Sequence, residues 1–210
     1  MSDLLDQVLS RRIVPVVVVR NAARAAGLAD ALVAGDLPVA EVTLRTEAAP
    51  EAIATMAKNP DLLVGAGTVL TPDQVDLAVD AGARFLVSPG FSAAAVARAN
   101  ERGVPIVPGT VTPSEVIAAL DAGLTTLKFF PAANYGGAGT LKAFSSVFSG
   151  ARFVPTGGVS ANNLGDYLTL PNVPAVGGSW MVPADTVDAG DFAEVQRLCA
   201  EAVAAAAAIG

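Results

Sequence analysis

The chain has 210 residues and a formal net charge of −7, from 13 Lys and Arg against 20 Asp and Glu, and it contains no histidine. With 52% hydrophobic and 16% charged residues, it can bury a large core, which excludes a disordered protein, and its acidic balance gives no indication of a nucleic-acid binder. The absence of histidine excludes zinc sites built on His and Cys clusters and every catalytic triad that needs an imidazole, so acid–base catalysis has to use a carboxylate, a tyrosine or a lysine.

Short apolar, β-branched runs alternate along the chain with longer Ala-rich segments of helical character. The predicted strands cover 13–19, 39–44, 62–66, 84–87, 104–107, 125–129, 152–155 and 174–176. Side chains that can cap a helix mark the predicted helix starts, at Thr71, Ser92, Thr112 and Ser160.

Eight strands that alternate with helices predict an α/β fold, a single (β/α)8 barrel domain of the TIM type over residues 1–210. A helical segment precedes the first predicted strand, and a C-terminal helix closes the domain. An open doubly wound sheet is the competing architecture. The barrel is favoured because polar residues follow nearly every strand, whereas an open sheet concentrates them at one switch point. The dinucleotide-binding fingerprint also fails in segment 65–70, because Leu70 stands where its third glycine belongs.

The cellular location is predicted from the cysteine count and the N-terminus. The single cysteine, Cys199, rules out an internal disulfide and fits a reducing compartment. The first residues are acidic where a secretion signal is basic, and the apolar run 13–19 is too short for a signal core. No window approaches the ~18 uninterrupted apolar residues of a membrane span. We therefore expect a cytoplasmic protein that does not interact with membranes.

The second predicted strand carries polar residues on one face. With the two-residue period of a strand, Glu41, Thr43 and Arg45 point to the same side. In a barrel this side faces inward, where a carboxylate is unfavourable unless it is paired or has a chemical role. One interpretation is therefore a functional Glu41, and the alternative is a structural pair between Glu41 and Arg45.

The sixth predicted strand contains one of only three lysines in the chain. Lys58 and Lys142 fall on helix segments, whereas Lys128 shares the inward strand face with Phe130. Because lysine is rarely buried in an apolar strand, Lys128 is a candidate nucleophile that forms a Schiff base with a carbonyl. The alternative is an ammonium group that only binds an anionic ligand.

Paired glycines follow the last two predicted strands, at 157–158 and 177–178. Glycines let backbone N–H groups approach an anion closely, and loops after strands seven and eight form the usual phosphate site of this barrel type. The alternative is two plain turns. Among the other strand ends, Thr68 could bind a small carboxylate beside Arg45, while Pro89 and Phe130 could enclose a methyl-sized fragment.

Together these segments resemble the family of 2-keto-3-deoxy-6-phosphogluconate (KDPG) aldolases, also known as KHG/KDPG aldolases, which are class I aldolases of the Entner–Doudoroff pathway. The resemblance covers about residues 14 to 200. The segments that carry it are 41–46, 65–70, 88–90, 112–115, 127–132, 155–158 and 177–180.

The resemblance implies a mechanism. Lys128 forms the Schiff base with the C2 carbonyl of the substrate, and Glu41 is the acid/base that moves protons through a water. The products are pyruvate and D-glyceraldehyde 3-phosphate. No cofactor and no metal take part, and the family is usually homotrimeric.

The resemblance also implies binding roles for a phosphorylated keto acid. Arg45 and Thr68 match positions that hold the pyruvyl carboxylate, and Pro89 and Phe130 line that pocket. The positions that match contacts to the substrate hydroxyls and phosphate are Thr156, Gly157, Gly158, Gly178 and Ser179.

Two alternatives remain open. The same chemistry could act on 2-keto-3-deoxy-6-phosphogalactonate, which differs only at C4, or on 4-hydroxy-2-oxoglutarate (KHG), in which a carboxylate replaces the phosphate end. A protein of another class, a barrel that binds phosphorylated metabolites without catalysis, requires Lys128 and Glu41 to be a mere salt bridge.

Overall fold

A computed structural model describes residues 2–209. Its strands are β1 (Ile13–Val17), β2 (Val39–Thr43), β3 (Leu63–Gly67), β4 (Leu86–Val87), β5 (Ile106–Val107), β6 (Gly109–Thr110), β7 (Thr126–Phe129), β8 (Arg152–Pro155) and β9 (Val176–Gly178). Its α-helices are α1 (Ser2–Leu9), α2 (Ala25–Ala34), α3 (Ala49–Met56), α4 (Pro72–Asp80), α5 (Ala93–Glu101), α6 (Pro113–Asp121), α7 (Gly137–Val147), α8 (Leu164–Leu168), α9 (Ala184–Ala189) and α10 (Phe192–Ala207). Two 3-10 helices, η1 (Ala22–Arg24) and η2 (Ala133–Tyr135), complete the described elements.

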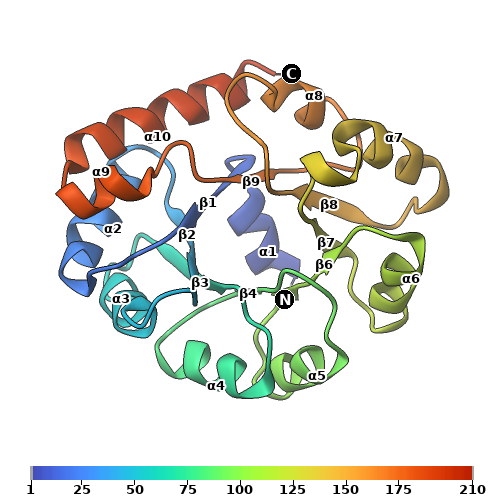
Figure 1. Ribbon diagram of the computed structural model, residues 1–210, viewed down its shortest axis with the longest axis horizontal. Coiled ribbons are helices and arrows are strands. Elements are labelled where there is room, and N and C mark those ends of the chain that lie inside the picture. The colour runs from blue at the N-terminus through green and yellow to red at the C-terminus, as the bar shows by residue number, and fades with distance from the viewer. Residues whose placement is uncertain (1, 210) are drawn as a thin grey trace.

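The strands form a curled parallel sheet in two sections. Six strands pair in the order β5-β4-β3-β2-β1-β9, and three pair in the order β6-β7-β8. Figure 1 shows the strands near the centre of the molecule, with helices α2 to α10 around the outside. The α/β fold with parallel strands is therefore confirmed, and the arrangement of the helices on the outer side of the curl differs from a doubly wound sheet.

The alternation of β7 separates its two faces as predicted. Leu127 and Phe129 are fully buried on the outer face, where the Phe129 ring meets Phe144 of α7 edge to face, with the ring centroids 6.2 Å apart. Lys128 lies between them in sequence and therefore faces the inside of the curl.

Three of the four predicted helix caps are present. The side-chain oxygens of Thr71, Ser92 and Thr112 each accept a hydrogen bond from a backbone N–H in the first turn of α4, α5 and α6. The prediction for Ser160 is wrong, because α8 begins only after Asn163. Ser160 does not accept a hydrogen bond from the helix but donates one: its backbone N–H donates to Asn163 Oδ1 over 2.8 Å.

Two strand predictions also need correction. β9 covers the glycines 177 and 178, for which the sequence predicts a loop, because Gly177 and Gly178 pair with Val14 and Pro15 of β1. The sequence pattern does not predict β6, since Pro108 interrupts the ladder directly after β5 and has no N–H to donate. Local propensity misses both segments because glycine and proline are depleted in strands.

Helix α1 covers the amino-terminal ends of the strands. Leu5, Val8 and Leu9 pack toward the inside of the curl, and Asp6 forms an ion pair of 2.8 Å with Arg152 at the start of β8. The opposite, carboxyl-terminal ends of the strands are left for the loops that carry the candidate site. None of the helices in the described part of the chain is long and apolar enough to cross a membrane.

Candidate active site

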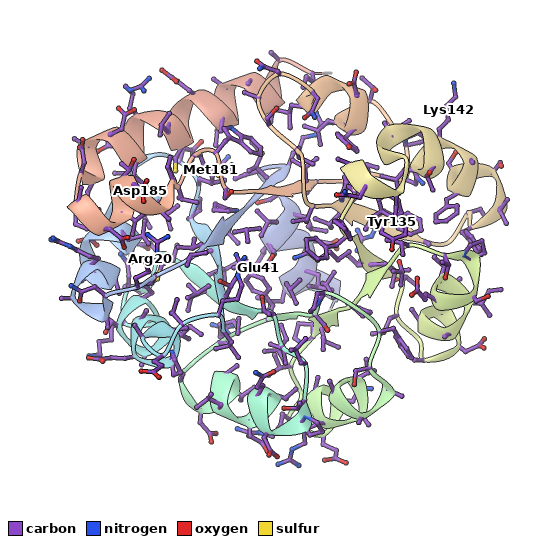
Figure 2. The ribbon with its side chains drawn as sticks, in the orientation of Figure 1. Arg20, Glu41, Tyr135, Lys142, Met181 and Asp185 are labelled. Carbon is purple, nitrogen blue, oxygen red and sulfur yellow. The ribbon has the colours of Figure 1, made fainter. Side chains whose placement is uncertain are left out.

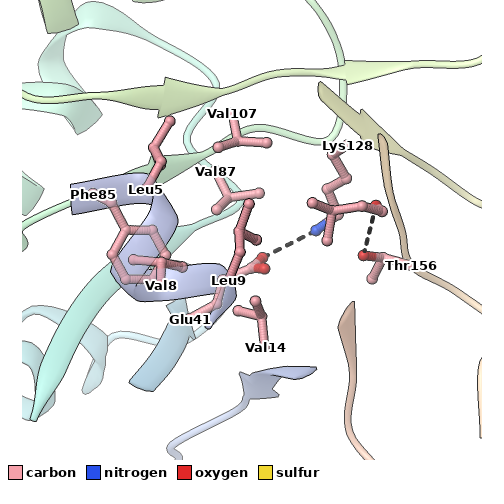
Figure 3. Close-up of a pocket in the computed structure, with 11 residues that line it drawn as sticks. Leu5, Val8, Leu9, Val14, Glu41, Phe85, Val87, Val107, Lys128 and Thr156 are labelled. Atoms are coloured by element: carbon pink, nitrogen blue, oxygen red, sulfur yellow. Dashed lines mark hydrogen bonds and ion pairs between the residues drawn. The ribbon is translucent and has the colours of Figure 1, made fainter. Parts of the chain in front are cut away.

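Lys128 and Glu41 form a buried ion pair inside the curl. The Lys128 Nζ group donates a hydrogen bond to Glu41 Oε1 over 3.0 Å, and the two residues are only 6% and 3% exposed. Figure 3 shows the two side chains directed at each other from β7 and β2. The alternative pair between Glu41 and Arg45 is wrong, because the Glu41 carboxylate pairs with Lys128. A buried pair of this kind adds little net stability, so its position points to a chemical role.

The other two lysines lie on the surface. Lys58 is exposed after α3, and Lys142 is exposed on α7, where Figure 2 shows it pointing away from the molecule. Lys128 is therefore the one lysine of the chain that is withdrawn from water.

The pair borders a small cavity with an apolar wall. Its volume is about 20 Å³, which is enough for one water molecule. The polar lining residues are Glu41, Lys128 and Thr156, and the apolar ones are Leu5, Val8, Leu9, Val14, Phe85, Val87, Val107 and Val154. Helix α1 thus closes the cavity at the amino-terminal ends of the strands. The low local dielectric strengthens the attraction between the charges of Lys128 and Glu41.

The ring of Phe130 lies near the Lys128 ammonium group. The Lys128 Nζ atom lies 5.2 Å from the centroid of the Phe130 ring, within the range of a cation–π contact. This half-buried ring also lines a second, larger cavity.

The second cavity, of about 170 Å³, lies at the carboxyl-terminal ends of the strands. Seven predicted site residues line it together with Val16 and Val159: Arg45, Phe130, Thr156, Gly157, Gly158, Gly178 and Ser179. Thr156 lines both cavities, so the two lie on either side of this residue.

The backbone of the loop after β8 explains its glycines. Gly157 and Gly158 have φ angles of 93° and 79°, a region that other residues rarely adopt. Gly158 is also exposed toward solvent. Backbone in this conformation, without side chains in the way, can present N–H groups to an anion.

Arg45 is held by a residue to which the sequence assigned no role. Its Nε atom donates to Thr43 Oγ1 over 3.2 Å, and Thr43 Oγ1 donates to the Val17 carbonyl over 3.1 Å. The inward alternation of β2 was the available signal, because it placed Thr43 on the face of Glu41.

Thr68 and Pro89 line neither of these two cavities. Thr68 follows β3 with a φ angle of 61°, and Pro89 follows β4, where its carbonyl lies against Gly109. Both occupy strand ends on the same side as Arg45, but their contribution to binding stays a prediction. Across residues 2–209, no group of three or more His, Cys, Asp or Glu side chains is placed to hold a metal ion.

The sequence model of the family described as KDPG and KHG aldolase matches residues 5–198. The chain belongs to this family. The resemblance carried by the sequence motifs is therefore confirmed. The KHG/KDPG aldolase of Escherichia coli K12 is 48% identical over 192 residues, which cover 91% of this chain and 90% of the relative.

Solved KDPG aldolases share the fold. The enzyme of Zymomonas mobilis ZM4, crystallised with 3-phosphoglycerate, has a TM-score of 0.90 and 44% identity, with 95% of both chains covered. The enzyme of Legionella pneumophila, with pyruvate captured as a covalent carbinolamine intermediate, has a TM-score of 0.88 and 42% identity, with 90% of this chain and 93% of the other covered.

Proposed function

We propose that this chain is a class I aldolase of the Entner–Doudoroff pathway that cleaves KDPG into pyruvate and D-glyceraldehyde 3-phosphate. The observation that carries the proposal is the 3.0 Å contact between Lys128 Nζ and Glu41 Oε1 inside an apolar cavity. Thr156 and Phe130, which contact the surroundings of this pair, also line the glycine-lined cavity, so a nucleophile, a proton carrier and a candidate phosphate site lie in one region.

The reaction begins with an imine at Lys128. Glu41 accepts a proton from Nζ, the freed lone pair bonds to C2 of the keto acid, and a nitrogen proton passes to the oxygen to give a carbinolamine. Glu41 then returns its proton to the hydroxyl group, which leaves as water, and a protonated imine remains. The pyruvate carbinolamine captured in the Legionella pneumophila enzyme is this kind of intermediate in that protein.

The imine is the electron sink for cleavage. Glu41, again a carboxylate, removes the proton of the C4 hydroxyl through a water, and the C3–C4 bond breaks. The electron pair moves into the C2–C3 bond to give an enamine, while C4 becomes the aldehyde carbon of glyceraldehyde 3-phosphate. Glu41 returns a proton to C3, and water hydrolyses the imine to release pyruvate and free Lys128. No cofactor or metal is required by these steps.

The two ends of the substrate are bound by different parts of the site. Arg45 and Thr68 hold the pyruvyl carboxylate, with Pro89 and Phe130 against the methyl group. The hydroxyl and phosphate end lies along the second cavity, against Thr156, Gly157, Gly158, Gly178 and Ser179. The 3-phosphoglycerate in the Zymomonas mobilis structure supports a phosphorylated three-carbon ligand.

A second substrate is favoured by the E. coli relative, whose name covers both KHG and KDPG. KHG keeps the pyruvyl half, so the chemistry at Lys128 is unchanged, and only the far anionic group differs. The C4 epimer, 2-keto-3-deoxy-6-phosphogalactonate, is the third substrate to compare. KDPG is expected to give the highest kcat/KM of the three.

The test combines a coupled pyruvate assay on all three substrates with borohydride trapping. Incubation with pyruvate and borohydride should add mass at Lys128, and the variant Lys128→Ala should release no pyruvate, whereas Lys142→Ala serves as the surface control. Wild type without an adduct refutes the Schiff base. Pyruvate release by Lys128→Ala favours a non-catalytic role for the pair, and a preference for KHG reassigns the substrate.

We also propose a closed (β/α)8 barrel in a single domain over 1–210, assembled as a homotrimer in the cytoplasm. Closure is supported at both seams of the sheet, since only Pro108 separates β5 from β6, and a parallel bridge joins Thr156, directly after β8, to Gly177 of β9. The trimer rests on the family resemblance. Light scattering on the purified protein tests it, and a monomeric mass refutes it.

A further inference from the structure

The inward face of β3 carries glycines where a strand usually carries side chains. In the register of β2 and β3, Glu41 is the partner of Gly65, and Thr43 is the partner of Gly67. The Glu41 side chain leans along the strand toward Gly67 rather than staying opposite Gly65. A Cβ atom on Gly67 would lie 2.3 Å from Glu41 Oε1, 2.6 Å from its Cγ and 2.9 Å from its Cδ.

These separations are too short for a real Cβ atom. The Glu41 atom in closest contact, Oε1, is also the one that accepts the hydrogen bond from Lys128. A methyl group at position 67 therefore cannot be added without moving the reacting oxygen. The surroundings are closed, because Glu41 is only 3% exposed.

The backbone gives no other reason for glycine at this position. Gly67 is absent from the glycines with positive φ, so an L residue can adopt its conformation. Glycine inside a strand is otherwise unfavourable, since it loses more conformational entropy on folding and packs no side chain. All three atoms nearest to the missing Cβ belong to Glu41.

We propose that Gly67 is a positioning residue for the reaction: the space left by its missing side chain holds the Glu41 carboxylate and fixes Oε1 against Lys128 Nζ. The inference rests on the proposed acid–base role of Glu41. Alanine at position 67 drives the carboxylate away from Nζ, which slows every proton transfer that Glu41 performs and leaves the lysine itself in place.

Gly65 offers a matched packing control on the same face of the same strand. A Cβ atom there would lie 2.6 Å from the Phe85 ring, and none of its three nearest atoms belongs to Glu41. Gly139, exposed in α7 with open space around its Cα, offers a control that meets nothing.

The decisive experiment measures exchange of the pyruvate methyl protons in D2O by NMR, which reports proton transfer at C3, together with borohydride trapping at Lys128 and thermal unfolding. Gly67→Ala should slow exchange ~100-fold, the scale of one lost general acid/base. Gly65→Ala should lower Tm with a much smaller loss of exchange, and Gly139→Ala should match wild type.

Truncation of Glu41 tests the collision itself. Glu41→Ala alone also slows exchange, and it removes all three atoms, Oε1, Cγ and Cδ, that collide with a methyl group at position 67. In this background a methyl group at position 67 displaces nothing, so the double variant Gly67→Ala/Glu41→Ala should match Glu41→Ala alone in exchange and in stability. If Gly67→Ala fails to fold, the double variant must fold as well as Glu41→Ala does.

Three results overturn the inference. The first is proton exchange by Gly67→Ala within ~3-fold of wild type. The second is a double variant whose loss of exchange is the product of the two single losses, and the third is misfolding of both Gly67→Ala and the double variant. All three require an active wild type. A wild type that forms no pyruvate adduct overturns the proposed function instead, so the two failures are distinct.

Discussion

Replacing Lys128 by methionine removes the positive half of the buried pair and leaves the Glu41 carboxylate in an apolar cavity. At the observed 3.0 Å, the attraction is about 5.5 kcal/mol with an effective dielectric constant of ~20. Removing both groups from water on folding opposes this gain by a similar amount. The pair is therefore close to neutral for stability, whereas one charge alone is strongly unfavourable.

The expected free energy of unfolding follows from that balance. Lys128→Met should lose about 3–5 kcal/mol, the usual result when one partner of a buried pair is removed. For a domain of this size this lowers Tm by about 10 °C. The double variant Lys128→Met/Glu41→Met carries no buried charge, and it should be at least as stable as wild type while having no activity.

Urea unfolding at pH 7, followed by circular dichroism, measures all three proteins. Lys142→Met is the matched control, because this lysine is exposed on α7, and its stability should stay within about 0.5 kcal/mol of wild type. A Lys128→Met variant as stable as wild type, or a double variant less stable than the single one, refutes the reasoning. The predicted pattern means that the chain keeps the pair for its chemistry.

Three further predictions concern other parts of the molecule. Burial raises the pKa of the Cys199 thiol from 9.0 to about 12, so the thiol ionises first in the unfolded chain. The free energy of unfolding should therefore fall from pH 9 upward, by about 1.4 kcal/mol at pH 10. Urea titrations of Cys199→Ala should not show this fall. Thr112→Ala breaks the capping box with Glu115 at the start of α6 and should lower the free energy of unfolding by about 1 kcal/mol. Ser179→Asp puts a carboxylate in the glycine-lined cavity and should lower kcat/KM for KDPG by about 10–100-fold through like-charge repulsion, while proton exchange on pyruvate, which has no phosphate, stays near wild type.

Much of the architecture follows from local pattern. The β-branched runs predicted the strands β1 to β5, β7 and β8 to within a few residues, since a buried parallel strand needs a continuous apolar segment. The two-residue alternation was sufficient to place Glu41 and Lys128 on inward faces. Both predictions depend only on neighbours in sequence.

Long-range pairing was not accessible in the same way. Glu41 and Lys128 are 87 residues apart, and no local pattern says which inward cation meets the carboxylate. Arg45 is the cation nearer to Glu41 in sequence, but its Nε atom donates a hydrogen bond to Thr43 rather than to Glu41. β6 and the glycines of β9 were missed for a related reason, because the ladder bonds of their neighbours hold them in the sheet against their own propensity.

Glycines inside the strands define the site as much as those in the loops. A Cβ atom on Gly177 would lie 2.3 Å from Thr156 Oγ1, so the bridge between these two residues depends on that missing side chain, as the seat of Glu41 depends on Gly67. Thr156 lines both cavities. In the proposed binding mode the pyruvyl end already reaches the larger cavity, through Arg45 and Phe130, and the phosphate end lies against the loop residues Gly157, Gly158 and Ser179. Because loops tolerate change better than packed strands, contacts to the phosphate end can alter without disturbing Lys128, the proposed Schiff-base residue.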